Sequence, residues 1–574
     1  MRNKNGLSVI FSPGIVLLIL LIFVTACSAP VEETPLVNPT EAPAAEAEPT
    51  ESAADPTEAP SAEVEPTQPA AEPTEPTAET EEEAVAPSGT LVVGIPHTVN
   101  ALDKANGATE YANSISQHIQ QMPFYPHPDG SVGPLLAESW EIIDDTHVRF
   151  NLRQGVTFTN GEPFNADVFM FSWEWINSNE VANAETWANV EAIDIHDDYS
   201  LTITFTNPDP LQLQKMAYFY PLYPPEYTQE VGMEGFGQAP IGTGPFVLDE
   251  WVAGDRIVLK ANPDYYEPGR PRLETVIFRP ITEDATRAAA LQAGDIDIAR
   301  LVPDELVPQL EQDPNIEVLK IQGTRNYSVL FNNMTTGVGT PIESREVRQA
   351  LNYAVDNEQI VDVILEGNGV AVDSFITPIM FGYDESQPTI PYDPERAREL
   401  LAEAGYPDGF SIAMACPAGA YVKIEQVCQA VAGYLEDVGV IVDLQIIESG
   451  QFWDQEASRE IAPLFLDGWG ARFPDATTPL LGAFVPDTVV DYGSTWANYY
   501  DPRYVELYEA QGFTLDQETR REAIQEFHRY MVEEPAAIWL YQSFVFTGVR
   551  NRVQGLEVYA NETQLLYDVS VTDE

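Results

Sequence analysis

The chain has 574 residues and a net charge of −63, with 91 acidic residues against 28 basic ones. This length is too great for a single hydrophobic core and predicts at least two domains. The charge argues against nucleic acid as a partner, because phosphates require a basic surface, and against direct binding to anionic lipid. We expect a solvated, acidic surface.

The first 26 residues are predicted to be a secretory signal peptide. Arg2 and Lys4 precede an apolar run over residues 6–24, and the sequence VTAC (24–27) follows. These four residues resemble a bacterial lipobox, in which the cysteine receives a diacylglycerol and begins the mature protein. An uncleaved membrane anchor with an incidental Cys27 is the alternative. We therefore expect a lipid anchor at Cys27 on the outer face of the cytoplasmic membrane.

Residues 27–87 are predicted to be a disordered, acidic tether. The segment is rich in Pro, Thr, Glu and Ala, with PTEAP at 39–43 and 56–60 and AEPTE at 47–51 and 71–75. Such a composition cannot bury enough apolar surface to fold, and proline keeps it extended. A tail that binds a regulatory partner is the alternative. No apolar run long enough to span a membrane follows residue 87.

The first half of the remaining chain alternates between predicted strands and a helix. The runs TLVVGI (90–95) and SLTITF (200–205) are typical of buried strands, and residues 167–176 are typical of a helix with a broad apolar face. Between them, residues 147–164 predict a strand, a turn near Gly155, a second strand through Val156 and Phe158, and another turn at Asn160-Gly161.

Two helices in the second half have clear end signals. In residues 282–300, Thr282 is the predicted N-cap and Gly294 the predicted C-terminal residue, followed by a short strand. In residues 392–409, Asp393 caps a helix that Pro394 opens and Gly405 ends.

A strand over 410–416, a helix over about 423–438 and a strand over 440–447 then predict a β-α-β unit. Together, the strands and helices along the chain indicate a mixed α/β fold.

Five segments, in this order, resemble the family 5 (cluster C) solute-binding proteins of ABC importers, the peptide, dipeptide and nickel type. The segments are residues 136–176, PIGTGPFVLDEW (240–251), LQAGDIDIA (291–299), residues 331–361 and YDPERARELLAEAGYPDG (392–409). The similarity covers about residues 89–550.

The resemblance implies two lobes joined by a hinge, with an extra domain inserted in the first lobe and a ligand trapped by hinge closure. We map these parts onto the sequence as lobe I (88–124, 216–324 and 536–574), inserted domain (125–215) and lobe II (325–535). The resemblance also implies a membrane permease as partner, and we expect a monomer.

Nothing in the sequence indicates an enzyme, a metal site or a cofactor. None of the six histidines shows metal-ligand spacing, GTGPF lacks the lysine of a phosphate loop, and no G-x-S-x-G occurs. His97 follows the first strand and is a candidate for lining the cleft. Cys416 and Cys428 could form a disulfide in an oxidising exterior, or could be two small buried side chains.

The stretch FLDGWGARFPD (465–475) is predicted to be a strand that runs into a ligand-facing loop. Its two glycines, at 468 and 470, would let the chain turn and leave Trp469 uncrowded. In peptide-binding members of the resembling family, an aspartate that pairs with the peptide ammonium occupies the position of Arg472.

The candidate ligand-binding residues are therefore Trp469, Gly470, Ala471, Arg472, Phe473 and His97. An arginine in place of the aspartate would repel an ammonium and favour an anion or sugar hydroxyls. Alternatively, Arg472 folds back on Asp467 or Asp475 and only shapes the loop.

The predicted function is capture of an extracellular solute, foremost an oligopeptide, and its delivery to an ABC permease. Three alternatives stay open: an oligosaccharide stacked on tryptophan, an anionic solute, and a receptor that signals to a membrane sensor.

Overall fold

The computed structural model describes five stretches of the chain: 86–104, 110–179, 187–387, 389–486 and 495–572. All of them belong to one compact unit that begins at Glu81. The predicted signal peptide, most of the tether and Cys27 lie outside these stretches. Within them, every helix is too short or too polar to cross a membrane.

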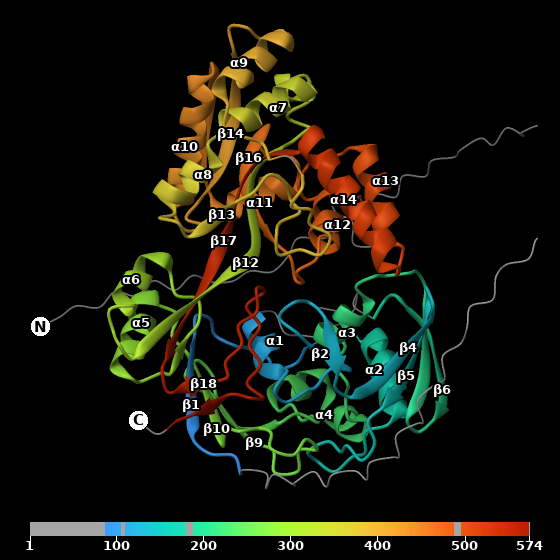
Figure 1. Cartoon of the computed structure of the whole chain (residues 1–574). Helices are drawn as coiled ribbons and strands as arrows, with labels where there is room; N and C mark the ends of the chain where they lie inside the picture. Colours follow the sequence, from blue (N-terminus) through green and yellow to red (C-terminus); the bar gives the residue numbers. More distant parts are fainter. Residues whose placement is uncertain (1–85, 105–109, 180–186, 388, 487–494, 573–574) are drawn as a thin grey trace, which may run out of the picture. The chain divides into compact units, whose positions relative to one another are not determined.

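Two long antiparallel strands form the hinge between the two lobes of this α/β fold. These strands, β12 (Ile316–Phe331) and β17 (Ala537–Arg550), run side by side (Figure 1). Within the described residues they occupy the middle of an eleven-stranded sheet with the path β15-β14-β16-β12-β17-β11-β1-β10-β9-β8, which β13 joins at β17. The lobes are thus connected by paired, extended backbone.

Lobe I contains the strands on one side of the hinge together with several helices, of which α4 packs against the core of the inserted region. Its β1 pairs in parallel with both β10 and β11. The elements are β1 (Thr90–Ile95), α1 (Glu110–Ser116), α4 (Pro225–Gln238), β8 (Phe246–Val252), β9 (Arg256–Ala261), β10 (Thr275–Pro280), α5 (Asp284–Ala293), β11 (Ile298–Ala299), η2 (Asp304–Leu306), α6 (Val307–Leu310), β18 (Val553–Gln554) and β19 (Ser570–Val571).

A separate antiparallel sheet, in the order β4-β5-β7-β6, lies in the region of the predicted inserted domain. Its inward side chains and those of α2 form a core of their own, which also includes Phe236 and Phe473 from outside the predicted boundaries. The elements are β2 (Phe124–Pro126), β3 (Val132–Pro134), β4 (Ala137–Asp144), β5 (His147–Leu152), α2 (Ala166–Ser178), β6 (Val190–Asp197), β7 (Ser200–Phe205) and α3 (Gln212–Phe219).

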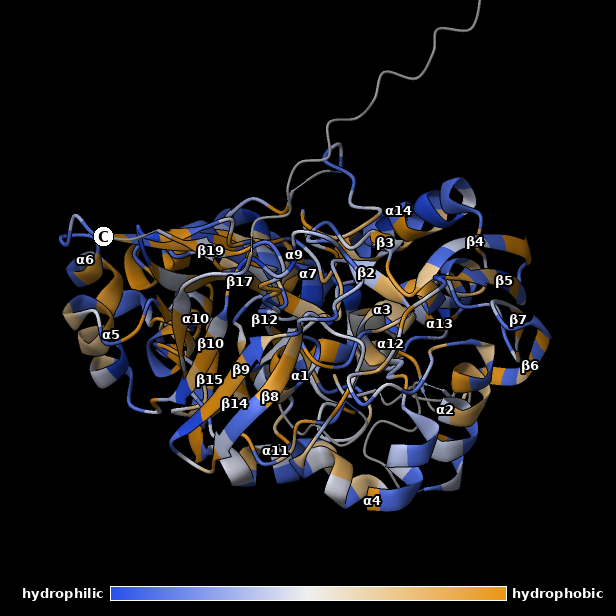
Figure 2. Ribbon diagram, turned by 90° about the horizontal axis from the view of Figure 1, so that it is seen from below, coloured by the Kyte–Doolittle hydropathy of each residue, from blue (hydrophilic) through white to orange (hydrophobic). Residues whose placement is uncertain are grey.

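Lobe II packs its helices around β14, β15 and β16. Most residues of β14 are buried or half-buried, and Figure 2 shows mainly hydrophilic residues on α14, as expected for a surface helix. The elements are η3 (Pro341–Glu343), α7 (Arg345–Ala354), α8 (Asn357–Gln359), η4 (Ile360–Ile364), β13 (Gly369–Ala371), α9 (Pro394–Glu403), β14 (Phe410–Ala418), α10 (Ile424–Asp437), β15 (Val440–Glu448), α11 (Ser449–Ala457), β16 (Leu464–Gly470), α12 (Thr477–Phe484), α13 (Pro502–Gly512) and α14 (Gln517–Glu533).

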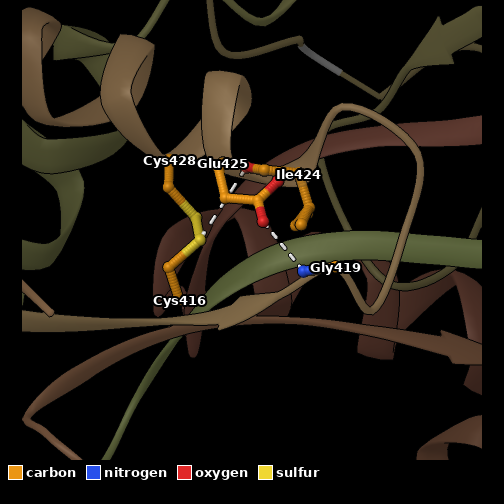
Figure 3. Close-up of a disulfide and its surroundings, with 5 residues drawn as sticks. All are labelled: Cys416, Gly419, Ile424, Glu425 and Cys428. Carbon is orange, nitrogen blue, oxygen red and sulfur yellow. Dashed lines mark hydrogen bonds between the residues drawn. A yellow bond between two sulfur atoms is a disulfide. The ribbon is translucent and has the colours of Figure 1, made fainter. Parts of the chain in front are cut away.

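The β-α-β unit predicted at 410–447 is present as β14, α10 and β15, with the two strands parallel. Cys416 on β14 and Cys428 on α10 are joined in a disulfide, and both are fully buried (Figure 3). The turn between them is held by Glu425, whose carboxylate accepts a hydrogen bond from the Gly419 amide at 2.8 Å. The disulfide and this hydrogen bond therefore attach the start of α10 to β14 and to the turn that follows it.

Several predicted elements have the predicted bounds, and others differ. The strands at 90–95 and 200–205 and the Asp393-capped helix are confirmed. The second strand of the hairpin predicted at 147–164 is wrong. Val156 and Phe158 are buried, but only an isolated bridge, Thr157 to Pro163, forms there, because β5 pairs instead with β4 and β7.

The N-cap predicted for the helix after residue 282 is also wrong by one residue. Glu283 has extended backbone, and its carboxylate accepts hydrogen bonds from the amides of Ala285 and Thr286 at 3.3 and 2.6 Å. A carboxylate at this position both caps the free amides and interacts favourably with the helix dipole. Gly294 ends the helix in the left-handed conformation, as predicted.

Candidate functional site

A cavity of about 870 Å³ lies where the two hinge strands pass between the lobes. Lobe I contributes the segments after β1 and β11 and the segment 560–562. Lobe II contributes the 419–422 turn and the end of β16, while β12 and β17 form the wall between them. Since both lobes and the hinge line it, a solute in this cavity would contact every part that moves in hinge closure.

A bulge in β12 shapes the hinge wall of this cavity. The register with β17 is regular through Gln322 and resumes at Asn326, so the three residues between them are out of register with the partner strand. Gly323 begins the bulge, where a Cβ would lie 2.9 Å from Val545 Cγ2. Bulges redirect side chains, and here Thr324 and Arg325 line the cavity.

The guanidinium of Arg325 is an exposed positive charge on the cavity wall. Its Nη1 donates to the carbonyl oxygen of Gly468 at 2.7 Å, and its Cζ lies 5.6 Å from the centroid of the Tyr421 ring. No other hydrogen bond or ion pair engages it within the described stretches. The side chain is thus oriented by two contacts while most of its five donors are free for a ligand.

Tyr421 links Arg325 to a pair of buried carboxyl groups. The tyrosine hydroxyl donates to Asp467 Oδ1 at 2.6 Å, and Asp467 lies beside Glu456. Burial, followed by the charge of Asp467, raises the pKa of Glu456 to about 9, and burial also raises the pKa of Asp467. The two carboxyl groups therefore hold a proton at neutral pH. The one negative charge that remains lies behind Tyr421, whose ring contacts Arg325.

Glu562 supplies a negative charge on the lobe I side of the cavity. Its Oε2 accepts a hydrogen bond from the Tyr111 hydroxyl at 3.0 Å, and its backbone is left-handed, with φ of 67°. Burial and then the Glu562 charge raise the pKa of Tyr111, so this hydroxyl remains a donor. A non-glycine residue in the left-handed region is strained, and such strain is frequent at ligand sites.

An ionic bridge joins the lobes at the cavity rim. Lys423 Nζ lies 3.1 Å from Asp304 Oδ2 in lobe I and 3.1 Å from Glu366 Oε1 in lobe II. Burial raises the pKa of Asp304, but hydrogen bonds from Glu305 and Lys423 outweigh it and the pKa is lowered overall. The bridge is accordingly charged at neutral pH and connects the two lobes directly.

Three of the residues predicted to bind ligand line the cavity, and three do not. His97, Gly470 and Ala471 are lining residues, and the His97 ring packs at 5.2 Å from that of Tyr111. Trp469 faces the other side of β16, where its indole packs on Trp496 with ring centroids 4.6 Å apart.

Arg472 and Phe473 leave the strand toward a different part of the molecule. Arg472 is exposed, with its Cζ 5.0 Å from the Phe219 ring centroid. Phe473 is 2% exposed and packs against Tyr218 and Phe219. These two residues therefore attach the end of β16 to α3 and lie outside the cavity lining.

The alternative in which Arg472 folds back on a nearby aspartate is wrong. Asp475 instead pairs with the buried Arg520 at 2.5 Å, and Asp467 is engaged by Tyr421. The predicted reason for the glycines also needs correction, since Gly468 and Gly470 lie within β16, opposite Tyr327 and Arg325 of β12. A Cβ on Gly468 would lie 2.6 Å from Tyr327 Cε1, so close packing, and not a turn, requires glycine there.

Sequence reasoning missed Arg325, Tyr421 and Glu562. Gly323 within an otherwise apolar strand was a signal for a bulge, but its partner strand lies more than 200 residues away. Within the described stretches, no cluster of three or more histidine, cysteine, aspartate or glutamate side chains is arranged to hold a metal ion.

Comparison with known proteins agrees with this architecture. Residues 131–489, more than half of the chain, match the family model of bacterial extracellular solute-binding proteins, family 5. The glutathione-binding protein GsiB of Salmonella typhimurium is 27% identical over 402 residues, which cover 69% of this chain and 77% of that protein.

Two solved structures align over most of the chain. HbpA2 from Haemophilus parasuis has a TM-score of 0.75 at 25% identity, covering 84% of this chain and 100% of that one. DppA from Helicobacter pylori, in complex with the peptide STSA, has a TM-score of 0.67 at 22% identity, covering 84% and 98%. The chain belongs to the family 5 bacterial extracellular solute-binding proteins.

Proposed function

We propose that this chain is the substrate-binding lipoprotein of an ABC import system. It captures a peptide or peptide-like solute in the cavity between its lobes and delivers it to a membrane permease. The observation that carries the proposal is the position of the cavity, because both lobes and both hinge strands line it. A solute bound there stabilises the closed form by contacting both lobes at once.

The composition of the cavity wall supports a peptide more than a sugar. The oligosaccharide alternative depended on stacking against tryptophan, but among the described residues no tryptophan lines the cavity, and Trp469 packs on Trp496 instead. The lining carries charges of both signs, Arg325 on one wall and Glu562 on another, which suits a solute with both signs of charge. The names of relatives point the same way, since GsiB is a glutathione-binding protein and DppA was solved with a peptide.

The ligand can be identified without prior assumption. Protein purified without denaturation should release a peptide or peptide-like compound that mass spectrometry detects. The unloaded protein should then bind glutathione or members of a tripeptide pool, with an increase in melting temperature. Release of a sugar, together with no binding of any peptide probe, would overturn the proposed ligand class.

The proposed anchor at Cys27 is tested separately. In a Cys27→Ser variant the lipid cannot be attached, so the protein should appear in the medium or remain unprocessed. A membrane-bound and fully processed variant would contradict the anchor. Co-purification of the wild-type protein with a permease, and not with a sensor protein, would support delivery for import.

A further inference from the structure

We propose that Arg325 binds a carboxylate of the ligand and Glu562 binds its ammonium group, so that the cavity selects zwitterionic peptides with free ends. This inference rests on the proposed peptide-binding function and assigns the recognition of the two charged groups to residues outside the GWGARF motif. It replaces Arg472 with Arg325 as the arginine that meets the ligand.

The first support is the orientation of Arg325. The β12 bulge directs this side chain into the cavity, and the bond from Nη1 to the Gly468 carbonyl fixes one edge of the guanidinium. A guanidinium donates in a planar fork that matches the two oxygens of a carboxylate. The edge that Gly468 leaves free can therefore bind a carboxylate without a change of side-chain conformation.

The second support is the position of Glu562 relative to the bulge. The segment that carries it is attached to β12 by a hydrogen bond from the Thr324 amide to the Ala560 carbonyl at 3.3 Å. Asn561 Nδ2 also donates to the Arg472 carbonyl at 2.9 Å, which ties the same segment to the end of β16. One backbone and one side-chain hydrogen bond thus hold the segment that carries Glu562 beside the bulge that carries Arg325.

The third support is that the two charges do not neutralise each other. They form no ion pair with each other, although both charges act on the hydroxyl of Tyr327, which also lines the cavity. Burial is the main cause that raises the pKa of the Tyr327 hydroxyl, with Arg325 lowering it and Glu562 raising it. Two unpaired opposite charges facing one cavity are a complementary site for a ligand that carries both signs.

The other acids of the lining are already engaged. Asp304 is bound by Lys423, and Asp284 pairs with the buried Arg287 at 2.6 Å. An incoming ammonium would have to break these pairs, whereas among the described residues the Glu562 carboxylate has only the neutral hydroxyl of Tyr111 as a partner. This difference assigns the ammonium to Glu562.

The test uses the mature protein and three pools of the same tripeptides: unmodified, C-terminally amidated and N-acetylated. Affinities are measured by native mass spectrometry and calorimetry. Wild type should bind the unmodified pool at least about tenfold more tightly than either modified pool, as expected for loss of one charge-assisted contact.

The variants should lose this discrimination selectively. Arg325→Gln should weaken binding of the unmodified pool about tenfold or more but bind the amidated pool as wild type does. Glu562→Gln should likewise weaken binding of the unmodified pool about tenfold or more but bind the acetylated pool as wild type does. Arg325→Lys keeps the charge without the planar fork and should be intermediate. Arg396→Gln on α9 and Glu557→Gln on the surface are matched controls and should bind all three pools as wild type does.

Distinct results separate this inference from the proposed function. If wild type binds no peptide pool, peptide capture itself is wrong. If wild type binds peptides but amidation and Arg325→Gln change nothing, the assignment of Arg325 is overturned while the function stands. If Arg472→Gln abolishes discrimination and Arg325→Gln does not, the motif position selects the ligand after all. Melting curves of each variant identify any loss that comes from unfolding.

Discussion

The bulge of β12 and the end of β16 are adjacent in the sheet, and each carries an exposed arginine. Arg325 at the bulge lines the cavity, whereas Arg472, two residues beyond the end of β16, lies over Phe219 outside it. Both residues are near Gly470, which pairs directly with Arg325. Two arginines in neighbouring segments therefore have different surroundings.

The difference shows that strand register, and not the position of a residue in a motif, decides which of the two charges lines the cavity. Successive residues of a strand point to opposite faces, and a bulge changes this alternation at one place. The β12 bulge turns Arg325 toward the cavity. The buried side chain of Phe473 packs against α3 and so directs the chain after β16 toward that helix. Arg472, the preceding residue, therefore lies over α3 as well.

The largest effect is expected from Phe473→Ala, which tests the attachment of the end of β16. Phe473 packs against Tyr218 and Phe219 in the core of the inserted region. Its removal should lower the free energy of unfolding by about 3–5 kcal/mol, measured by denaturant titration. Phe513→Ala is the matched control, because Phe513 is 37% exposed and should cost little. Equal losses for both variants would mean that Phe473 does not anchor this segment.

Gly468→Val on β16 tests the packing that positions Arg325 on the neighbouring strand β12. The new Cβ would lie 2.6 Å from Tyr327 Cε1 and 3.3 Å from Arg325 Cδ, so both side chains must move. We expect a loss of about 1–3 kcal/mol in stability together with weaker peptide binding.

Gly470→Ala on the same strand is the control for Gly468→Val. Its nearest neighbour would be Thr324 Oγ1 at 3.5 Å, an ordinary contact. We expect its melting temperature to stay close to that of wild type. A Gly470→Ala variant as unstable as Gly468→Val would refute the packing explanation.

The buried carboxyl pair behind Tyr421 should make stability depend on pH. The pKa of Glu456 is raised to about 9, so the folded protein holds a proton that the unfolded chain releases above its ordinary acid range. The contribution is therefore complete at low pH and is lost as pH rises toward 9, with a slope of at most about 1.4 kcal/mol per pH unit. Glu456→Gln should flatten the melting temperature between pH 6 and 9, while Glu460→Gln should not.

The smallest effect is expected from Arg472→Ala. The exposed guanidinium contributes one contact with the Phe219 ring, worth about 0.5–1 kcal/mol at an exposed site. Peptide affinity should stay within about twofold of wild type, since the side chain lies outside the cavity lining. A tenfold loss of affinity without a change in melting temperature would restore Arg472 as a ligand residue and remove the distinction between the two segments.

Local patterns of sequence were sufficient for much of the fold. Short runs typical of buried strands predicted β1 and β7, and the Asp393-Pro394 pair predicted the start of α9, because these signals depend only on neighbouring residues. Five ordered segments also indicated the family, which the match over residues 131–489 confirms, and its two-lobed architecture, which the structure shows. The strand predicted near Phe158 does not form, because β4 and β7 already pair with the two edges of β5.

The lining of the candidate binding cavity was decided by the tertiary structure. The sequence by itself determined that an arginine and an aromatic residue follow two glycines after an apolar strand. It did not determine which face of β16 each side chain would occupy, since that depends on pairing with β12, about 140 residues earlier. The bulge that exposes Arg325 arises from pairing with β17, more than 200 residues later. Side-chain direction in a sheet is a property of paired strands, so only the assembled sheet could place a charge in the cavity.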